Sequence, residues 1–224
     1  MKTAQRILLT ALAMFNEHGE NAVTSVDIAI ELDISPGNLY YHFKGKESLV
    51  SALMKMHEQQ MQPLLRREKL DTLHAQEIMY YLYMLVDSIH VFRFFYKSPA
   101  DLAEKYPAII RPRKHILKSL NDQLGFLFDS LATRKVLSAT KDERRLLVDL
   151  MSLIITQSCQ FDELNSHMDS TMQRYHALSL VKVSLLPRLL LSDDERAQLE
   201  NALSSYSLAR NFTSPSPLEF AEKV

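Results

Sequence analysis

The sequence predicts an all-α protein, and three observations support this fold class. Only four glycines and eight prolines occur among the 224 residues, so few positions disfavour a helix. Apolar residues recur three and four positions apart along most of the chain, as they do on one face of a helix. No stretch rich in valine, isoleucine or threonine shows the alternation of a half-buried strand. Because 46% of the residues are hydrophobic, we expect one large or two small helical domains with a sizeable core.

Composition and charge narrow the class of protein. The formal net charge is −1, so the chain lacks the basic character of proteins that bind nucleic acid by charge alone. A single cysteine, Cys159, leaves no partner for an internal disulfide or a CxxC metal site, which suits a reducing compartment. Polar residues interrupt the apolar N-terminal stretch, and no run is long enough to span a membrane. We expect a cytoplasmic protein without membrane association.

Two helices are predicted at the N-terminus. The apolar stripe of residues 3–18 ends at Gly19, a residue typical of helix C-termini. Thr24 and Asp27 form a capping signal, because their side chains satisfy amides at a helix start. The helix that follows reaches Leu32 and carries apolar residues at helical spacing, namely Val26, Ile28, Ala29 and Leu32.

A third helix is predicted from Pro36 to about Phe43. Ser35 and Pro36 supply the residues favoured at an N-cap and at the first helical position. Leu39 and Phe43 lie four residues apart and are expected to pack inward. Two short helices joined by a tight turn form the geometry that places the second helix in the DNA major groove. Its remaining faces are mostly polar or aromatic, with Gly37, Asn38, Tyr40, Tyr41 and His42.

The segment SPGNLYYHFKGKE, residues 35–47, together with residues 24–34, resembles the signature of TetR-type transcriptional regulators. The similarity extends over roughly the first sixty residues and rests on many fixed positions. Asp33 departs from the pattern, which has glycine in this turn, although aspartate tolerates a left-handed backbone. The resemblance implies an N-terminal helix-turn-helix domain and a C-terminal helical domain.

The resemblance also implies roles for individual residues. Those that would face base edges are Pro36, Gly37, Asn38 and Tyr41. Those that would hold DNA phosphates are Thr24, Ser25, Tyr40, His42 and Lys46. Lys46 begins a further helix, whose positive end favours a bound phosphate. An alternative for Tyr40 and His42 is that they only pack within the small domain.

The remaining chain is predicted to be helical. One helix covers residues 46–61 and stops before Pro63. A long, aromatic-rich helix covers residues 72–97, a brief helix follows Ser98-Pro99, and another covers residues 113–132. A last helix begins at a capping box formed by Ser192 and Glu195 and reaches about residue 208. Its acidic first turn, Asp193 to Glu195, suits the helix dipole and is not interpreted as a metal site.

Residues 140–161 and 172–191 are predicted to form two helices with more apolar surface than one core contact uses. Thr140 and Glu143 form the capping box of the first. Such a pair suits a symmetric four-helix interface, and the resemblance implies the same, a homodimer built from the C-terminal helix pair. We therefore expect a DNA-binding domain at 1–46, an effector-binding and dimerisation domain at 47–210, and a flexible tail at 211–224.

The long helix contains the candidate effector residues. Asp87, His90 and Arg93 lie three residues apart, along one side of a helix otherwise lined by aromatic residues. An apolar pocket with a few polar groups is the usual form of a small-molecule site, and Arg93 suits an anionic group. The competing interpretation is an internal salt bridge that runs from Asp87 through His90 to Arg93.

These expectations combine into a functional hypothesis. The chain is expected to be a homodimeric repressor that binds a palindromic double-stranded DNA operator and is released by a small, largely apolar effector. The aromatic segment FRFFY, with the recognition motif, resembles regulators of lipid metabolism, which favours a fatty-acyl effector. The alternative is a DNA-binding regulator whose C-terminal domain responds to a protein partner and binds no small molecule. No nucleophile with a base, phosphate loop or metal-ligand spacing indicates an enzyme, a cofactor or a metal.

Overall fold

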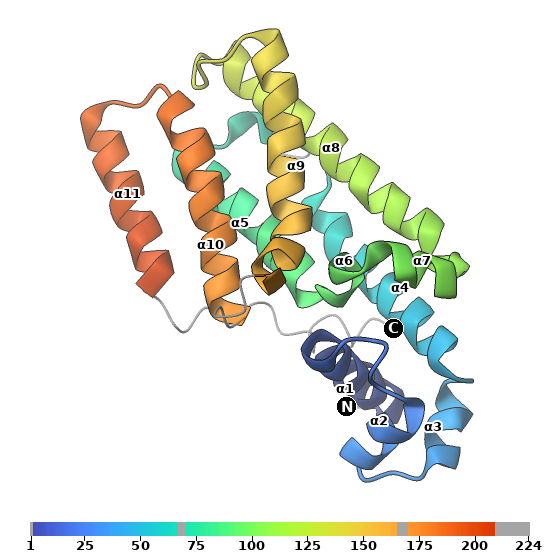
Figure 1. The fold of residues 1–224 in the computed structure, drawn as a ribbon. Helices are drawn as coiled ribbons and strands as arrows, with labels where there is room; N and C mark the ends of the chain where they lie inside the picture. The colour runs from blue at the N-terminus through green and yellow to red at the C-terminus, as the bar shows by residue number, and fades with distance from the viewer. Residues whose placement is uncertain (1, 67–69, 165–169, 209–224) are drawn as a thin grey trace. The chain divides into compact units, whose positions relative to one another are not determined.

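The computed structural model describes residues 2–66, 70–164 and 170–208, and every regular element within these ranges is a helix (Figure 1). The only strand-like pairing in them is an isolated antiparallel bridge between Leu137 and Leu189. The predicted all-α class is therefore confirmed. No helix in the described ranges is long and apolar enough to cross a membrane.

The chain divides into two compact units, which we describe separately. The first unit combines the N-terminal helices with a segment that follows later in the sequence, and consists of residues 2–62 and 91–116. The second unit contains the other described residues, 63–66, 70–90, 117–164 and 170–208.

The first unit begins with four helices, α1 (Thr3–His18), α2 (Ser25–Glu31), α3 (Pro36–His42) and α4 (Lys46–Leu64). The first three contact one another in pairs. Gly19 ends α1 with a φ of 80°, a backbone conformation that favours glycine, so this predicted helix end is confirmed. The buried apolar residues of the three helices are Ile7, Leu8, Ala11, Leu12 and Phe15 of α1, Ile28 and Ala29 of α2, and Leu39 of α3.

The seven-residue α2 buries only a narrow face, with Ile28 and Ala29 buried and Val26 49% exposed. One expectation for the first four helices is wrong. The helix that begins at Lys46 does not stop before Pro63 but continues to Leu64. Proline at this position costs the helix one hydrogen bond and interrupts little of it, because only Leu64 follows.

Residues 72–97 do not form the single helix that the sequence predicts. They contain the end of η1 (Leu70–Thr72), then α5 (Ala75–Val91) and α6 (Phe94–Lys97). Asn16 of α1 holds the break open, because its side-chain amide donates to the Val91 carbonyl at 2.8 Å and its oxygen accepts from the Phe94 N–H at 3.1 Å. Asn16 is buried, so it satisfies these two backbone groups where water does not.

Beyond the break, α6 contacts α7 (Pro99–Lys105), which begins after Ser98 as predicted and contacts η2 (Pro107–Ile109). Phe92 and Tyr96 are fully buried against His57 of α4. The Nε2 atom of His57 lies 2.8 Å from the Tyr96 hydroxyl. Burial lowers the pKa of His57 to about 3, so this imidazole is neutral at physiological pH.

The helices of the second unit follow the predicted order with shifted ends. α8 (Ile110–Thr133) starts before the predicted residue 113, because Pro112 fits within its first turn. The helix predicted to reach 191 ends earlier, as α10 (Ser170–Leu185), and Pro187 lies in the short η3 (Leu186–Arg188) that follows. The other helices are α9 (Lys141–Leu164), which contacts α10, and α11 (Asp193–Leu208).

Both predicted capping boxes of this unit are confirmed. The Thr140 N–H and hydroxyl donate to the Glu143 carboxylate at 2.7 and 2.8 Å. The Ser192 N–H and hydroxyl each donate to the Glu195 carboxylate at 2.8 Å. These bonds lower the pKa of both carboxyl groups, which therefore remain charged at neutral pH.

Candidate nucleic-acid interface and effector region

A tight turn joins α2 to α3. Asp33 adopts a φ of 53°, the left-handed conformation expected at this position, and its N–H donates to the Ile30 carbonyl at 3.0 Å. The Ile34 N–H donates to the Ala29 carbonyl at 3.0 Å, which closes the end of α2. Ser35 then starts α3, because its hydroxyl accepts from the Asn38 N–H at 3.1 Å. This turn fixes the direction of α3 relative to α2.

Helix α3 buries one side chain and exposes the others. Leu39 is 1% exposed, whereas Tyr41 is 83% and Tyr40 is 61% exposed. The rings of Tyr41 and His42 meet edge to face, with centroids 5.2 Å apart. His42 is exposed as well, so neither Tyr40 nor His42 packs into the core of the small domain. The other predicted base-reading residues are also exposed, namely Pro36, Gly37 and Asn38.

The predicted phosphate-binding residues at the start of α2 differ in their local bonds. The Thr24 hydroxyl accepts from the Asp27 N–H at 3.2 Å and donates to the Asp27 carboxylate at 2.7 Å, so it caps α2 as predicted. Two hydrogen bonds from Thr24 lower the pKa of Asp27, and the bond from the Thr24 backbone has a larger effect than the bond from its side chain. Ser25 is half-buried at the first position of α2.

Lys46 belongs to a charge cluster around the buried Glu20 that the sequence did not predict. Its ammonium lies 2.7 Å from the carboxylate of Glu20 and donates to the Glu20 carbonyl at 2.5 Å. The same carboxylate accepts from Lys105 at 3.1 Å and from the Tyr106 hydroxyl at 2.5 Å. Burial alone would raise the pKa of Glu20, but these hydrogen bonds outweigh it and hold the pKa below its ordinary value. Glu20 is therefore a charged group inside the first unit.

The predicted alignment of the effector residues is wrong. α5 ends at Val91, so Arg93 does not continue the helix that carries Asp87 and His90. Asp87 is buried and forms an ion pair of 2.9 Å with Arg174 of α10. His90 is also buried, and its Nδ1 atom lies 3.5 Å from the thiol of Cys159 in α9. Asp87 and His90 thus connect α5 to two different helices of the second unit.

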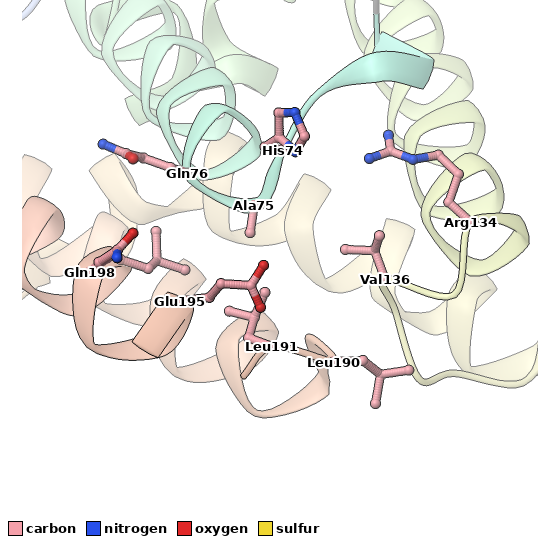
Figure 2. Close-up of a pocket in the computed structure, with 10 residues that line it drawn as sticks. His74, Ala75, Gln76, Arg134, Val136, Leu190, Leu191, Glu195 and Gln198 are labelled. Carbon is pink, nitrogen blue, oxygen red and sulfur yellow. The ribbon is translucent and has the colours of Figure 1, made fainter. Parts of the chain in front are cut away.

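The second unit also contains an open cavity of about 280 Å³ (Figure 2). Figure 2 shows residues from the start of α5 facing residues of α11 across it. Arg134 is held at its edge, because its guanidinium donates to the carbonyls of Asp71 and Leu73 at 2.7 Å each. The lining combines apolar and charged groups and does not include the predicted effector residues; it consists of His74, Ala75, Gln76, Arg134, Val136, Leu190, Leu191, Glu195, Gln198 and Leu199.

An apolar surface extends over α9 and α10, which contact each other. On α9, exposed leucines recur at helical spacing, with Leu146 at 66% and Leu153 at 58% exposure. On α10, Val183 is 71% exposed. The residues of this α9–α10 surface are Leu146, Leu150, Leu153, Phe161, Met172 and Val183. The expected second apolar face of these helices is therefore present.

A metal centre finds no support in the described residues, which contain no group of three or more histidine, cysteine, aspartate or glutamate side chains placed to bind an ion. The acidic residues Asp193 to Glu195 lie in the first turn of α11, where the helix dipole favours them.

The short α2, the tight turn and the exposed α3 define a helix-turn-helix DNA-binding protein. Comparison with known proteins gives its family. Residues 7–53 match the family described as bacterial regulatory proteins, tetR family, and residues 56–199 match the TetR family described as bacterial transcriptional repressor. The chain belongs to the TetR family of transcriptional regulators, which are not enzymes.

Individual proteins resemble different parts of the chain. The transcriptional regulator QacR of Staphylococcus aureus is 35% identical over 83 residues, which cover 37% of this chain and 44% of QacR. The matched segment thus spans less than half of this relative. The structure of a TetR-family regulator from Marinobacter aquaeolei VT8 covers 92% of this chain and 99% of its own, with a TM-score of 0.73 and 24% identity. The structure of a complex of SmeT with triclosan covers 82% of this chain and 91% of its own, with a TM-score of 0.56 and 16% identity. Both structures show the same fold.

The backbone of Asp33 leads to a first prediction. Replacing Asp33 by alanine should lower the free energy of unfolding by about 1 kcal/mol, because alanine lacks the side chain that eases a left-handed conformation. Asp33→Gly should cause no such loss. Urea denaturation measures both, and Glu31→Ala, an exposed position at the end of α2, serves as the control. Equal stability of the alanine and glycine variants would show that the turn imposes no conformational demand.

Proposed function

We propose that the chain is a ligand-responsive repressor that binds a palindromic operator as a homodimer in the cytoplasm and is released by a small, largely apolar effector. The observation that supports the DNA-binding part best is the surface of α3. A helix that exposes Tyr41 to 83% beside exposed Asn38 presents aromatic and amide groups to a partner. These are the groups that read base edges in the major groove.

Within this proposal, the residues of α3 contact bases. Asn38 would offer its amide to a base edge, and Tyr41 would offer its ring to a thymine methyl group or its hydroxyl to a base. DNA would approach the start of α3 closely at Pro36 and Gly37. Glycine is not required there by packing, because a Cβ atom at Gly37 would meet only the Ser35 hydroxyl, at 3.9 Å. Close approach of the DNA would explain its small size.

Phosphate contacts would surround this surface. We propose that Thr24 and Ser25 bind one phosphate at the start of α2, and that Tyr40 and His42 bind the backbone beside α3. Lys46, the first residue of α4, would provide a cation for a further phosphate. Because the net charge of the chain is −1, these placed groups, and not a general positive field, would carry DNA binding.

The α9–α10 surface supports the proposed homodimer. Six large apolar side chains are exposed on two helices that contact each other, and leaving them in water is unfavourable. A second copy of the same surface would cover them in a symmetric four-helix arrangement. Two recognition helices related by a two-fold axis would then bind two half-sites, which is the reason to expect a palindromic operator.

The effector is proposed on chemical grounds. Asp87 and His90 remain candidates because they are buried polar residues among apolar ones, and Arg93 is a candidate apart from them. The complex of the structurally similar SmeT with triclosan is an example of an apolar ligand on this fold. For this chain we propose a small apolar molecule, with fatty-acyl compounds as the first class to test.

DNA recognition is tested with an operator selected from a random duplex pool. Tyr41→Ala should weaken operator binding by about 1–3 kcal/mol and change binding to random duplex little, because it removes contacts to bases. Ser25→Ala should weaken operator and random duplex alike, because it removes a phosphate contact. Fluorescence anisotropy at fixed salt measures both. Equal losses on the two duplexes for Tyr41→Ala would contradict its assignment to base recognition.

The proposed dimer interface gives a second test. Leu146→Glu combined with Leu153→Glu should convert the dimer into a monomer, because each copy would place two charges in an apolar interface. Light scattering coupled to size-exclusion chromatography measures the mass. Leu190→Glu is a matched control, since Leu190 is as exposed as Leu153, at 58%, but lies outside α9 and α10. A dimer that survives the double substitution would place the interface elsewhere.

Thermal unfolding in the presence of fatty acids or fatty-acyl-CoA tests the effector. A ligand that binds only the folded protein should stabilise it by about 2.7 kcal/mol at a hundred times its Kd, and should raise Tm accordingly. It should also release the labelled operator. If no acyl compound or apolar phenol raises Tm while operator binding is intact, the protein-partner alternative becomes the better explanation.

A further inference from the structure

The carboxylate of Glu20 is shared between the DNA-binding head and α7. Lys46 at the start of α4 and the Tyr106 hydroxyl both contact its Oε1 atom, and Lys105 at the end of α7 contacts its Oε2 atom. The Glu20 side chain is only 5% exposed, whereas that of Lys46 is 22% and that of Lys105 is 46% exposed. Glu20 is thus a buried anion with more donors than an isolated ion pair requires.

We propose that Glu20 is a positioning residue that competes with the DNA backbone for the ammonium group of Lys46, and that α7 sets the strength of this competition through Lys105 and Tyr106. The inference rests on the proposed phosphate role of Lys46. In the free protein Lys46 is paired with Glu20; in the complex a phosphate oxygen competes with the Glu20 carboxylate, so that Lys46 binds the phosphate in only part of the complexes.

The donors from α7 make this exchange feasible. A buried carboxylate that loses its only cation is strongly destabilised, because its charge is left without a partner. Glu20 would not be left in that state, since Lys105 and Tyr106 continue to donate to it after Lys46 leaves. Lys46 is also partly exposed, so a phosphate can reach it without opening the core.

The same geometry gives α7 an influence on DNA affinity. Each hydrogen bond that Lys105 or Tyr106 donates to the Glu20 carboxylate weakens the ion pair between that carboxylate and Lys46. If Lys105 and Tyr106 withdraw, Glu20 depends on Lys46 alone, holds it more tightly and leaves it less available to DNA. The position of α7 therefore changes the charge that the head presents to a phosphate, in addition to any change in the direction of α3.

The test uses substitutions with opposite expected signs. Glu20→Gln should strengthen binding to operator and random duplex and steepen the dependence of log Kobs on log salt by up to about 0.9 per subunit. The reason is that no carboxylate then competes with a phosphate for Lys46, although the bond of Lys46 to the Glu20 carbonyl remains. Tyr106→Phe, which changes no charge, should weaken binding and make the dependence shallower. Glu17→Gln, at an exposed residue at the end of α1, is the control for a charge change without a contact to Lys46.

A double substitution separates the possible failures. If the proposal is correct, Lys46→Met makes the slope of log Kobs against log salt shallower by about 0.9 in a protein that also carries Glu20→Gln. In the otherwise native protein the same substitution changes the slope by less. If Lys46 binds a phosphate but Glu20 does not compete, Lys46→Met costs the same in both backgrounds, which overturns the inference alone. If Lys46→Met changes neither slope, the phosphate role of Lys46 is wrong. Identical effects of Glu20→Gln and Glu17→Gln would also overturn the inference.

Variants that fail to fold are recognised by thermal unfolding. Because Tyr106→Phe keeps every charge of the cluster, its effect on the salt slope decides the question if Glu20→Gln proves unstable. An unchanged slope in a folded Tyr106→Phe protein would contradict control by α7.

Discussion

The interruption of the helical segment at residues 92–93 depends on one side chain, Asn16. Its amide bonds the Val91 carbonyl and the Phe94 N–H, two groups that would otherwise have helical partners or remain unsatisfied. Because the chain turns at this point, Phe92 and Tyr96 pack against His57 of α4, and α7 reaches Glu20 near the end of α1. A single buried amide thus brings α6 and α7 into the same unit as the helix-turn-helix.

His57 and Glu20 are both buried in the first unit but differ in charge. His57 is neutral because burial lowers its pKa to about 3 and no anion compensates, so it contributes as a packed aromatic ring with one hydrogen bond. Glu20 is charged because three donors outweigh its burial. Of the two groups, only the charged Glu20 carboxylate forms an ion pair with a lysine, as the proposed competition with a phosphate requires.

The DNA-binding surface does not depend on a basic field. The chain is close to neutral, and Lys46 is already paired inside the protein. Recognition by such a head would come from groups that are placed by the fold, such as Tyr41 and Asn38 on a helix whose first turn is fixed by Ser35. The family assignment agrees with this arrangement, since the helix-turn-helix segment and the C-terminal segment both match TetR regulators.

Features that depend on residues close together in the chain could be predicted from the sequence. Thr24 with Asp27, Thr140 with Glu143, and Ser192 with Glu195 set helix starts through bonds across three residues, and Gly19 ends α1 for an equally local reason. The break after Val91, the pairing of Glu20 with both Lys46 and Lys105, and the pairing of Asp87 with Arg174 could not be predicted from the sequence. These features depend on contacts between residues up to 87 positions apart, as in the pair of Asp87 and Arg174, and periodicity carries no information about such contacts.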